Sequence, residues 1–364
     1  MRFWKLVSVV LLACGLASAQ HITSFSAPGG GTGYDQGTGG FDINPQGTVV
    51  GSLHDDNNVF HGFQCVAGCA AGTFTEYNAP GAGTGANQGT ITFSNNLFGE
   101  TVGFYVDANN VAHGFATAYP FRNFVDLNVP GAGTGANQGT FAANVNLGGE
   151  IAGYYVDATN VAHGFVSYPP YRSYTSFDPP GSANTITAVA TSLSLEGAVA
   201  GTYFDEGGVA HGYVRAANGT ITEFNVRGAG TESGQGTESA SISDVGVITG
   251  NYIDSNDVNH GFVRGPFGEI TTFDVAGAGT GANQGTLPEG INLLGLITGQ
   301  YVDANNVNHG FVRSPWGVIT TFDVPGAGTA AGQGTIPATP NVFGVIVGQW
   351  IDANNVHYGF LRYP

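Results

Sequence analysis

The sequence predicts an all-β fold, specifically a seven-bladed β-propeller of four-stranded antiparallel blades. The first observation is a repeated phrase, clearest at 303–311 as Asp-Ala-Asn-Asn-Val-Asn-His-Gly-Phe. Its histidine recurs every 48 to 52 residues, at His61, His113, His163, His211, His260 and His309. Tyr358-Gly359-Phe360 takes its place in a seventh copy. A fixed period of this length is typical of repeat architectures, in which each unit buries its apolar face against its neighbours.

The second observation is the pattern within one repeat, taken from 286 to 324. Strand-rich runs at 290–294 and 296–303 are broken at Gly295. The segment 303–307 is a turn sequence, because Asp and Asn tolerate left-handed backbone and cap their own turns. Two further strands are expected at 307–313 and 318–324, separated by a turn at 314–317. Four short strands with period-two patterning and no helical stretch describe a propeller blade.

Within the second strand of each repeat, a glycine is followed two residues later by a large side chain on the same face. The glycines are Gly51, Gly103, Gly153, Gly201, Gly250, Gly299 and Gly348, and the large residues are Leu53, Tyr105, Tyr155, Tyr203, Tyr252, Tyr301 and Trp350. A strand glycine beside a large ring usually marks the close approach of a neighbouring sheet. We therefore expect the large residues to form the core between blades rather than a ligand platform.

The third observation concerns the two ends of the repeat array. The segment 21–27 matches a fourth strand with no unit before it, and the last unit stops after a third strand. Pairing 22–27 beside 356–362 would complete the last blade and close the ring without an exposed edge. An open solenoid would need distinct capping repeats, and none is visible.

The first residues have the pattern of a secretion signal. Arg2 and Lys5 precede an apolar run at 6–16, and Ala17-Ser18-Ala19 is a small-residue cleavage site. We expect a signal peptide at 1–19, a repeat domain at 20–364, and a secreted, extracellular or periplasmic protein. Alternatively, Leu11-Leu12-Ala13-Cys14 resembles a lipobox, which would leave the protein anchored through lipidated Cys14. No later segment is apolar over the length that a membrane span requires.

Cysteine usage and charge agree with export. Cys65 and Cys69 are the two cysteines outside the signal, and we expect a disulfide between them, with half of a metal site as the alternative.

The formal net charge is −17, from 9 basic and 26 acidic residues, and removing Arg2 and Lys5 leaves 7 − 26 = −19. Such a surface repels nucleic acid and anionic membranes, and it favours solubility or cation binding. We expect a monomer with no nucleic-acid partner.

The repeated phrase Gly-x-x-x-x-Asp-x-Asn-Asn-Val-x-His-Gly-Phe resembles the bacterial extracellular HAF repeats, named for a His-Ala-Phe triplet. Gly114, Gly164, Gly212, Gly261 and Gly310 stand where that family has Ala. The resemblance covers all seven units and implies a secreted or surface protein of propeller form. It implies no catalytic residue.

The candidate binding face combines two repeated segments that a propeller places on one side. They are the turn after the second strand and the link to the next blade, and they supply Asp55, Asp107, Asp157, Asp205, Asp254, Asp303 and Asp352, with Gln36, Gln88, Gln138, Gln235, Gln284 and Gln333. The aspartates can be interpreted as turn caps or, alternatively, as Ca²⁺ ligands, although the ligand series of an EF-hand loop is missing. The repeated histidines are interpreted as buried hydrogen-bonding groups rather than metal ligands, because Tyr358 replaces one of them. We assign no cofactor.

No catalytic motif is present: the sequence lacks a G-x-S-x-G elbow, an H-E-x-x-H helix and a phosphate-binding loop. Polar residues that break the repeat symmetry, His54, Asp56, Glu206, Glu232 and His357, are scattered along the chain and are not assigned to a site. The leading hypothesis is a non-enzymatic binding, adhesion or matrix protein whose partner is a carbohydrate or another surface protein. The alternatives are a propeller hydrolase or lyase with its active site in the central channel, and a purely structural envelope protein.

Overall fold

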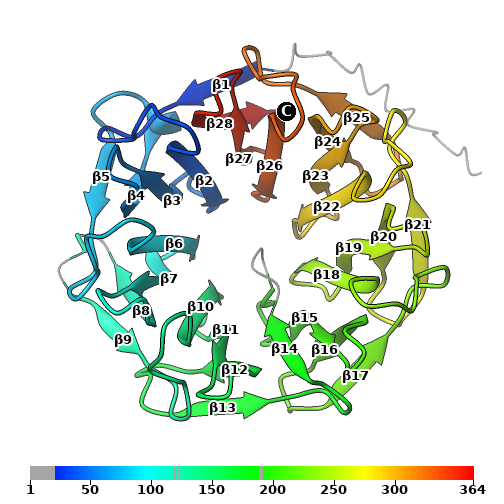
Figure 1. Ribbon diagram of the computed structural model, residues 1–364, viewed down its shortest axis with the longest axis horizontal. Helices are drawn as coiled ribbons and strands as arrows, with labels where there is room; N and C mark the ends of the chain where they lie inside the picture. Colours follow the sequence, from blue (N-terminus) through cyan, green and yellow to red (C-terminus); the bar gives the residue numbers. More distant parts are fainter. Residues whose placement is uncertain (1–20, 119, 122, 188–191) are drawn as a thin grey trace, which may run out of the picture.

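The computed structural model describes residues 21–118, 120–121, 123–187 and 192–364, and over these the fold is all-β. Its 28 strands belong to one hydrogen-bonded network, and the described residues contain no α-helix, only a short 3₁₀ turn at Ala67–Cys69. Figure 1 shows the strands arranged as successive small sheets around a common axis. The expected signal peptide at 1–19 and Cys14 lie outside the described residues. Among the residues described, no helix is long and apolar enough to cross a membrane.

Each unit contains four antiparallel strands, in agreement with the sequence. The first strands, nearest the axis in Figure 1, are β2 (Gly37–Ile43), β6 (Gly89–Asn95), β10 (Gly139–Val145), β14 (Asn184–Thr187), β18 (Gly236–Ile242), β22 (Gly285–Ile291) and β26 (Gly334–Pro340). The second strands are β3 (Val49–His54), β7 (Glu100–Val106), β11 (Ile151–Val156), β15 (Val199–Phe204), β19 (Ile248–Ile253), β23 (Ile297–Val302) and β27 (Ile346–Ile351). The third strands are β4 (Phe60–Cys65), β8 (Ala112–Ala118), β12 (Ala162–Ser167), β16 (Ala210–Arg215), β20 (Asn259–Arg264), β24 (Asn308–Arg313) and β28 (His357–Tyr363). The fourth strands are β5 (Phe74–Tyr77), β9 (Val125–Leu127), β13 (Tyr174–Phe177), β17 (Ile221–Phe224), β21 (Ile270–Phe273), β25 (Ile319–Phe322) and β1 (His21–Phe25).

The pairing expected between the two ends of the array is present. Strand β1 runs antiparallel to β28, from His21 opposite Tyr363 to Phe25 opposite Gly359. Strand β28 also touches β2 through the pair His357 and Gly37. The same single-residue parallel contact joins other successive units, for example Phe60 of β4 with Gly89 of β6.

The first strand of the unit starts and ends earlier than the sequence predicts. It was expected at 290–294, and β22 instead covers Gly285–Ile291. The chain turns at Asn292, because the side-chain oxygen of Asn292 accepts the backbone N–H groups of Leu294 and Leu296, and Gly295 adopts φ +80°. The mixed sequence at 285–289, which includes Pro288, gave no strand signal.

The second-strand glycines are required for a different reason from the one predicted. A Cβ on Gly103 would lie 2.1 Å from the carbonyl oxygen of Ile91, which belongs to the first strand of the same unit and not to a neighbouring sheet. The pairing of β6 with β7 shifts register between Thr92 and Ser94, so a β-bulge brings the two backbones close together there.

The expected core between units is confirmed. Tyr105 is buried in one cluster with Tyr77 and Ala79 of the preceding unit, and Trp350 packs in the same way with Phe322 and Val324. The aromatic residue of each His-Gly-Phe element is fully buried: Phe63, Phe115, Phe165, Tyr213, Phe262, Phe311 and Phe360. The repeat therefore encodes mainly how one unit packs against the next.

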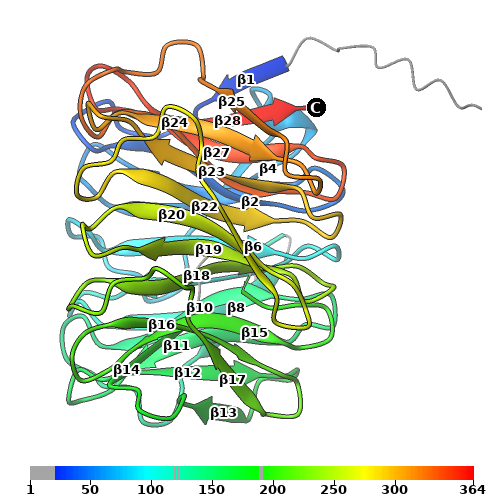
Figure 2. The same cartoon turned by 90° about the vertical axis from the view of Figure 1, so that its right-hand side faces the viewer.

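The molecule has two distinct faces, seen edge-on in Figure 2. The link face carries the turns between second and third strands, such as 303–307, and the links between units, such as 324–334. The hairpin face carries the turns between first and second strands, such as 292–296, and between third and fourth strands, such as 314–318. The predicted disulfide between Cys65 and Cys69 is formed, in the connection that follows β4.

Candidate functional site

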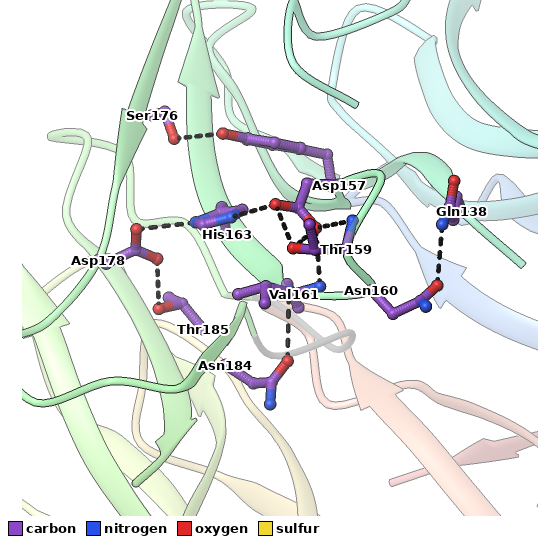
Figure 3. A network of polar contacts seen from close by, with 12 residues as sticks. Gln138, Asp157, Thr159, Asn160, Val161, His163, Ser176, Asp178, Asn184 and Thr185 are labelled. Atoms are coloured by element: carbon purple, nitrogen blue, oxygen red, sulfur yellow. Dashed lines mark hydrogen bonds and ion pairs between the residues drawn. The ribbon is translucent and has the colours of Figure 1, made fainter. Parts of the chain in front are cut away.

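The repeated aspartates and histidines of the link face form one local module per unit. In the unit of Figure 3, Asp157 Oδ1 accepts the backbone N–H groups of Thr159 and Val161, at 2.8 and 2.9 Å. Asp157 Oδ2 lies 3.6 Å from His163 Nε2, and His163 Nδ1 lies 2.8 Å from Asp178. The bonds from Val161 and Thr159 lower the pKa of Asp157 to about 2. The carboxylate thus serves its own turn, which favours the turn-cap interpretation.

The histidines are half-buried and their partners are side chains rather than the turn backbone. His309, for example, lies between Asp303 and Asp323, at 3.7 and 3.0 Å, and its ring stacks on Tyr301 at 4.9 Å between centroids. Trp350 stacks on Tyr358 in the corresponding place, which explains why tyrosine can replace histidine there. Among the described residues, no group of three or more His, Cys, Asp or Glu side chains has an arrangement that could hold a metal ion.

The glutamines of the predicted binding face tie each link to the turn beside it. Gln138 Oε1 accepts the N–H of Gly135 at 2.8 Å, and its Nε2 donates to Asn160 Oδ1 at 2.9 Å. The same pair of bonds recurs at Gln36, Gln88, Gln235, Gln284 and Gln333. Four of the six side chains are buried: Gln36, Gln138, Gln235 and Gln333. Their polar atoms have partners within the fold, so the sequence-predicted face offers little that is free to bind.

A different candidate lies along the axis, where three cavities follow one another. At the link face, a cavity of about 220 Å³ is lined by Phe41, Phe60, His54, His357 and Gln349 among others. A cavity of about 240 Å³ shares Phe41 and Gln349 and adds Phe93 and Glu289. At the hairpin face, a cavity of about 330 Å³ is lined by first-strand ends from around the ring, such as Asn44, Asn96 and Asn146. We call these together the central channel.

Aromatic rings form a continuous arc along one side of the channel. Phe41 contacts Phe93 at 6.0 Å between centroids, and Phe93 contacts Phe104 at 5.6 Å. Phe104 then meets Phe141 at 4.9 Å, and Phe141 stacks on Tyr154 at 4.8 Å. All five rings are half-buried. Of these five rings, Phe41 and Phe93 line the channel, unlike the fully buried Phe residues of the core.

The other side of the channel carries polar side chains among apolar ones such as Ile336 and Ala338. The positions that correspond to the arc carry Glu238, Asn251, Glu289, Gln300 and Gln349 in later units. Burial and the charge of Glu238 raise the pKa of Glu289 to about 7. Asn251 donates to Glu238 at 3.1 Å, whereas Gln300 Oε1 is buried with no hydrogen-bond partner among the described residues. A buried acceptor without a partner carries an energetic cost, which a ligand donor would remove.

The cavity at the link face contains the least symmetric cluster of the molecule. His357 Nε2 lies 3.1 Å from Asp35 Oδ1, and His54 Nδ1 donates to the Asp35 carbonyl at 2.9 Å. His54 stacks on Phe60 at 4.2 Å, and its Nε2 has no partner among the described residues. Because Nδ1 carries the proton, Nε2 presents a lone pair. Burial lowers the pKa of His357, which keeps this imidazole neutral at pH 7.

Sequence reasoning noted His54 and His357 as departures from the repeat but treated them as scattered. The β28 and β2 contact brings them together across almost the whole chain length. The sequence did contain a signal for this cluster. Both histidines replace the apolar or amide side chains of other units, and their repeat positions meet at the boundary between the last and first units. Asp56, Glu206 and Glu232 stay on the link face and do not join the cluster.

Comparisons with known proteins show the fold alone. No protein-family model and no curated protein matches the sequence. The BP39L lectin from Burkholderia pseudomallei superposes with a TM-score of 0.51 at 10% identity, covering 90% of this chain and 98% of the lectin. The S511A mutant of puromycin hydrolase, complexed with PGG, gives 0.52 at 13% identity, covering 91% of this chain and 50% of that one. The chain thus shares a β-propeller fold with both proteins, and it covers half the length of the hydrolase.

Proposed function

We propose that the protein binds carbohydrate in its central channel and catalyses no reaction. The observation that carries this proposal is one cavity of the channel, which Phe41 and Phe93 line together with Glu289 and Gln349. Saccharides present apolar C–H faces and hydroxyl edges, so they fit a site with aromatic surface on one side and hydrogen-bonding groups on the other. His54 lines the cavity at the link face, and its Nε2, without a partner among the described residues, is an acceptor for such hydroxyls.

This proposal moves the site away from the aspartates and glutamines of the link face. Their polar atoms stabilise turns and links, whereas the channel residues differ between units and have unsatisfied atoms. The likeness to a lectin agrees with the proposal at the level of fold.

The proposed architecture is a closed ring of seven blades, with β1 as the outer strand of the last blade. Support comes from the β1 and β28 register and from side-chain bonds across the same boundary. Thr339 donates to Asp42 Oδ1 at 2.9 Å, and Asn341 Nδ2 donates to the Asn44 carbonyl at 3.3 Å. In the same way, Asn44 Nδ2 donates to the Asn96 carbonyl between the first two units.

Export remains part of the proposal, with removal of residues 1–19 or lipidation at Cys14 as the two routes. The Cys65 and Cys69 disulfide agrees with an oxidising compartment. We also propose that the chain is related to the HAF repeats, that it is a monomer and that it requires no cofactor.

The test is a glycan array probed with residues 20–364, followed by titration of the best ligand. Phe41→Ala and Phe93→Ala should each weaken binding at least tenfold, because each removes a stacking surface. Tyr34→Ala is the matched control, since Tyr34 is an exposed aromatic on the link face, at 76% exposure. Circular dichroism should confirm that all three variants fold. No binding to any glycan would remove the proposal and favour a purely structural role.

A hydrolase or lyase acting in the same channel is the second candidate, favoured by one observation. Glu289, with its pKa near 7, and Glu238 provide a protonated carboxyl beside a second acidic group, the combination that glycoside cleavage uses. Incubation with the bound glycan, followed by measurement of new reducing ends, separates the two functions. New reducing ends formed by the wild type but not by Glu289→Gln would establish enzymatic activity and overturn the non-enzymatic proposal.

A further inference from the structure

The exposed large apolar side chains gather on one face of the molecule. Among the described residues they are Val66, Leu97, Phe98, Val125, Leu147, Tyr168, Leu195, Val245, Phe267, Leu293, Leu294, Trp316, Val318 and Phe343 on the hairpin face, with Tyr34 alone on the link face. Phe267 and Trp316 are 95% and 88% exposed at the tips of their turns. Single exposed apolar residues are ordinary, but a set confined to one face marks an interaction surface.

The fold holds these tips in place rather than leaving them loose. Asn96, Asn292 and Asn341 each accept the backbone N–H of the residue two positions later, at 3.0 Å. Those residues are Phe98, Leu294 and Phe343, so three units present an apolar side chain from the same turn position. The strands that lead to these three turns, β6, β22 and β26, each have seven residues.

We propose that the hairpin face docks on the surface of a phospholipid bilayer. Exposed apolar tips distributed over one face match a flat, deformable surface. Trp and Tyr, found here as Trp316 and Tyr168, are the residues that favour the membrane–water interface. The repeated turn aspartates lie on the opposite face, so docking in this orientation keeps that charge in water.

The position of the chain's first strand supports the same orientation. His21, the first residue of β1, pairs with Tyr363 at the hairpin face. Six residues separate His21 from Cys14, a reach of about 20 Å when fully extended. A lipid on Cys14, the alternative maturation route, would therefore enter the membrane on the side where the apolar tips lie. Docking by the tips does not require that lipid. It would cover the channel's cavity at the hairpin face, whose lining includes Leu97, Leu147 and Leu293.

The experiment uses residues 20–364 and vesicles of phosphatidylcholine. Trp350→Tyr, which installs the residue found at the same position of most other units, leaves Trp316 as the sole tryptophan. Emission from Trp316 should shift to the blue on addition of vesicles and should be quenched by brominated lipid, while the protein co-sediments. Vesicles rich in phosphatidylglycerol should bind less at low salt, because the net charge of the chain is negative.

A matched set of variants completes the test. Phe98→Ser, Leu294→Ser and Phe343→Ser should each lower the partition coefficient about tenfold, since each removes one large side chain from the contact. Tyr34→Ser on the link face should leave it unchanged. Three results would overturn the proposal. They are unchanged Trp316 emission without co-sedimentation, an equal loss in Tyr34→Ser, or a dimer in sedimentation analysis that the hairpin-face substitutions dissociate.

Discussion

Asp35 and His357 lie 322 positions apart in the sequence, yet His357 Nε2 is 3.1 Å from Asp35 Oδ1. The contact depends on the pairing of β28 with β2, where the last and first units meet. Both residues belong to the cavity at the link face that also contains His54. The boundary between the array's two ends is therefore one place where the repeat departs from its own pattern.

This pair gives a prediction about pH. Burial lowers the folded-state pKa of His357 below 6.5, so the unfolded chain binds the proton more readily. The resulting stability is fully present above pH 6.5 and is lost as pH falls through the folded-state pKa. His357→Asn, which copies Asn308 of another unit, should reduce the stability lost between pH 7.5 and 5.5. Urea unfolding at both pH values measures this, and an unchanged pH dependence would refute the assignment.

A second prediction concerns the turn aspartates. Asp303→Asn should change the stability by less than about 0.5 kcal/mol, since Asn can accept the same N–H bonds from Asn305 and Val307. Asp303→Ala, the matched control, should cost about 1 kcal/mol, as for other lost caps. EDTA should leave the melting temperature unchanged for the wild type. A fall of several degrees that Ca²⁺ reverses would instead make these aspartates metal ligands.

The glycine of the His-Gly-Phe element gives a third prediction. A Cβ on Gly310 would lie 2.8 Å from the ring of Phe322, so Gly310→Ala should destabilise the protein by about 1–3 kcal/mol. Adding Phe322→Leu should recover part of that loss, because the smaller side chain leaves room for the methyl group. Thermal unfolding of both single variants and the double variant tests this. Additive losses would show that the ring is not the obstacle.

Removal of β1 provides the fourth prediction. Deleting residues 20–28 exposes the edge of β28 and removes Phe25 from a core that includes Phe63 and Phe74. We expect a lower melting temperature and concentration-dependent association, as unpaired edges usually produce. Phe25→Ala should give the lower melting temperature without the association. An unchanged melting temperature of the deletion variant would contradict ring closure.

The sequence predicted what the units share and missed where they differ. The period located the second, third and fourth strands, the aromatic core and the pairing of the first strand of the chain with the last, because each depends on residues repeated in register. The observed pairing joins 21–25 to 359–363, close to the predicted 22–27 and 356–362. The channel was missed because its wall changes from Phe93 and Phe104 in one unit to Glu289 and Gln300 in another. The close contact of second-strand glycines was assigned to the wrong neighbour, since a β-bulge such as that opposite Gly103 leaves no clear sequence signal.

The most direct test of carbohydrate binding in the channel is a crystal structure of residues 20–364 with the best glycan from the array. The account predicts saccharide density along Phe41 and Phe93, with hydroxyl groups hydrogen-bonded to Gln349 or Glu289. Density on the link face beside Asp303 and Gln284, with an empty channel, would contradict it.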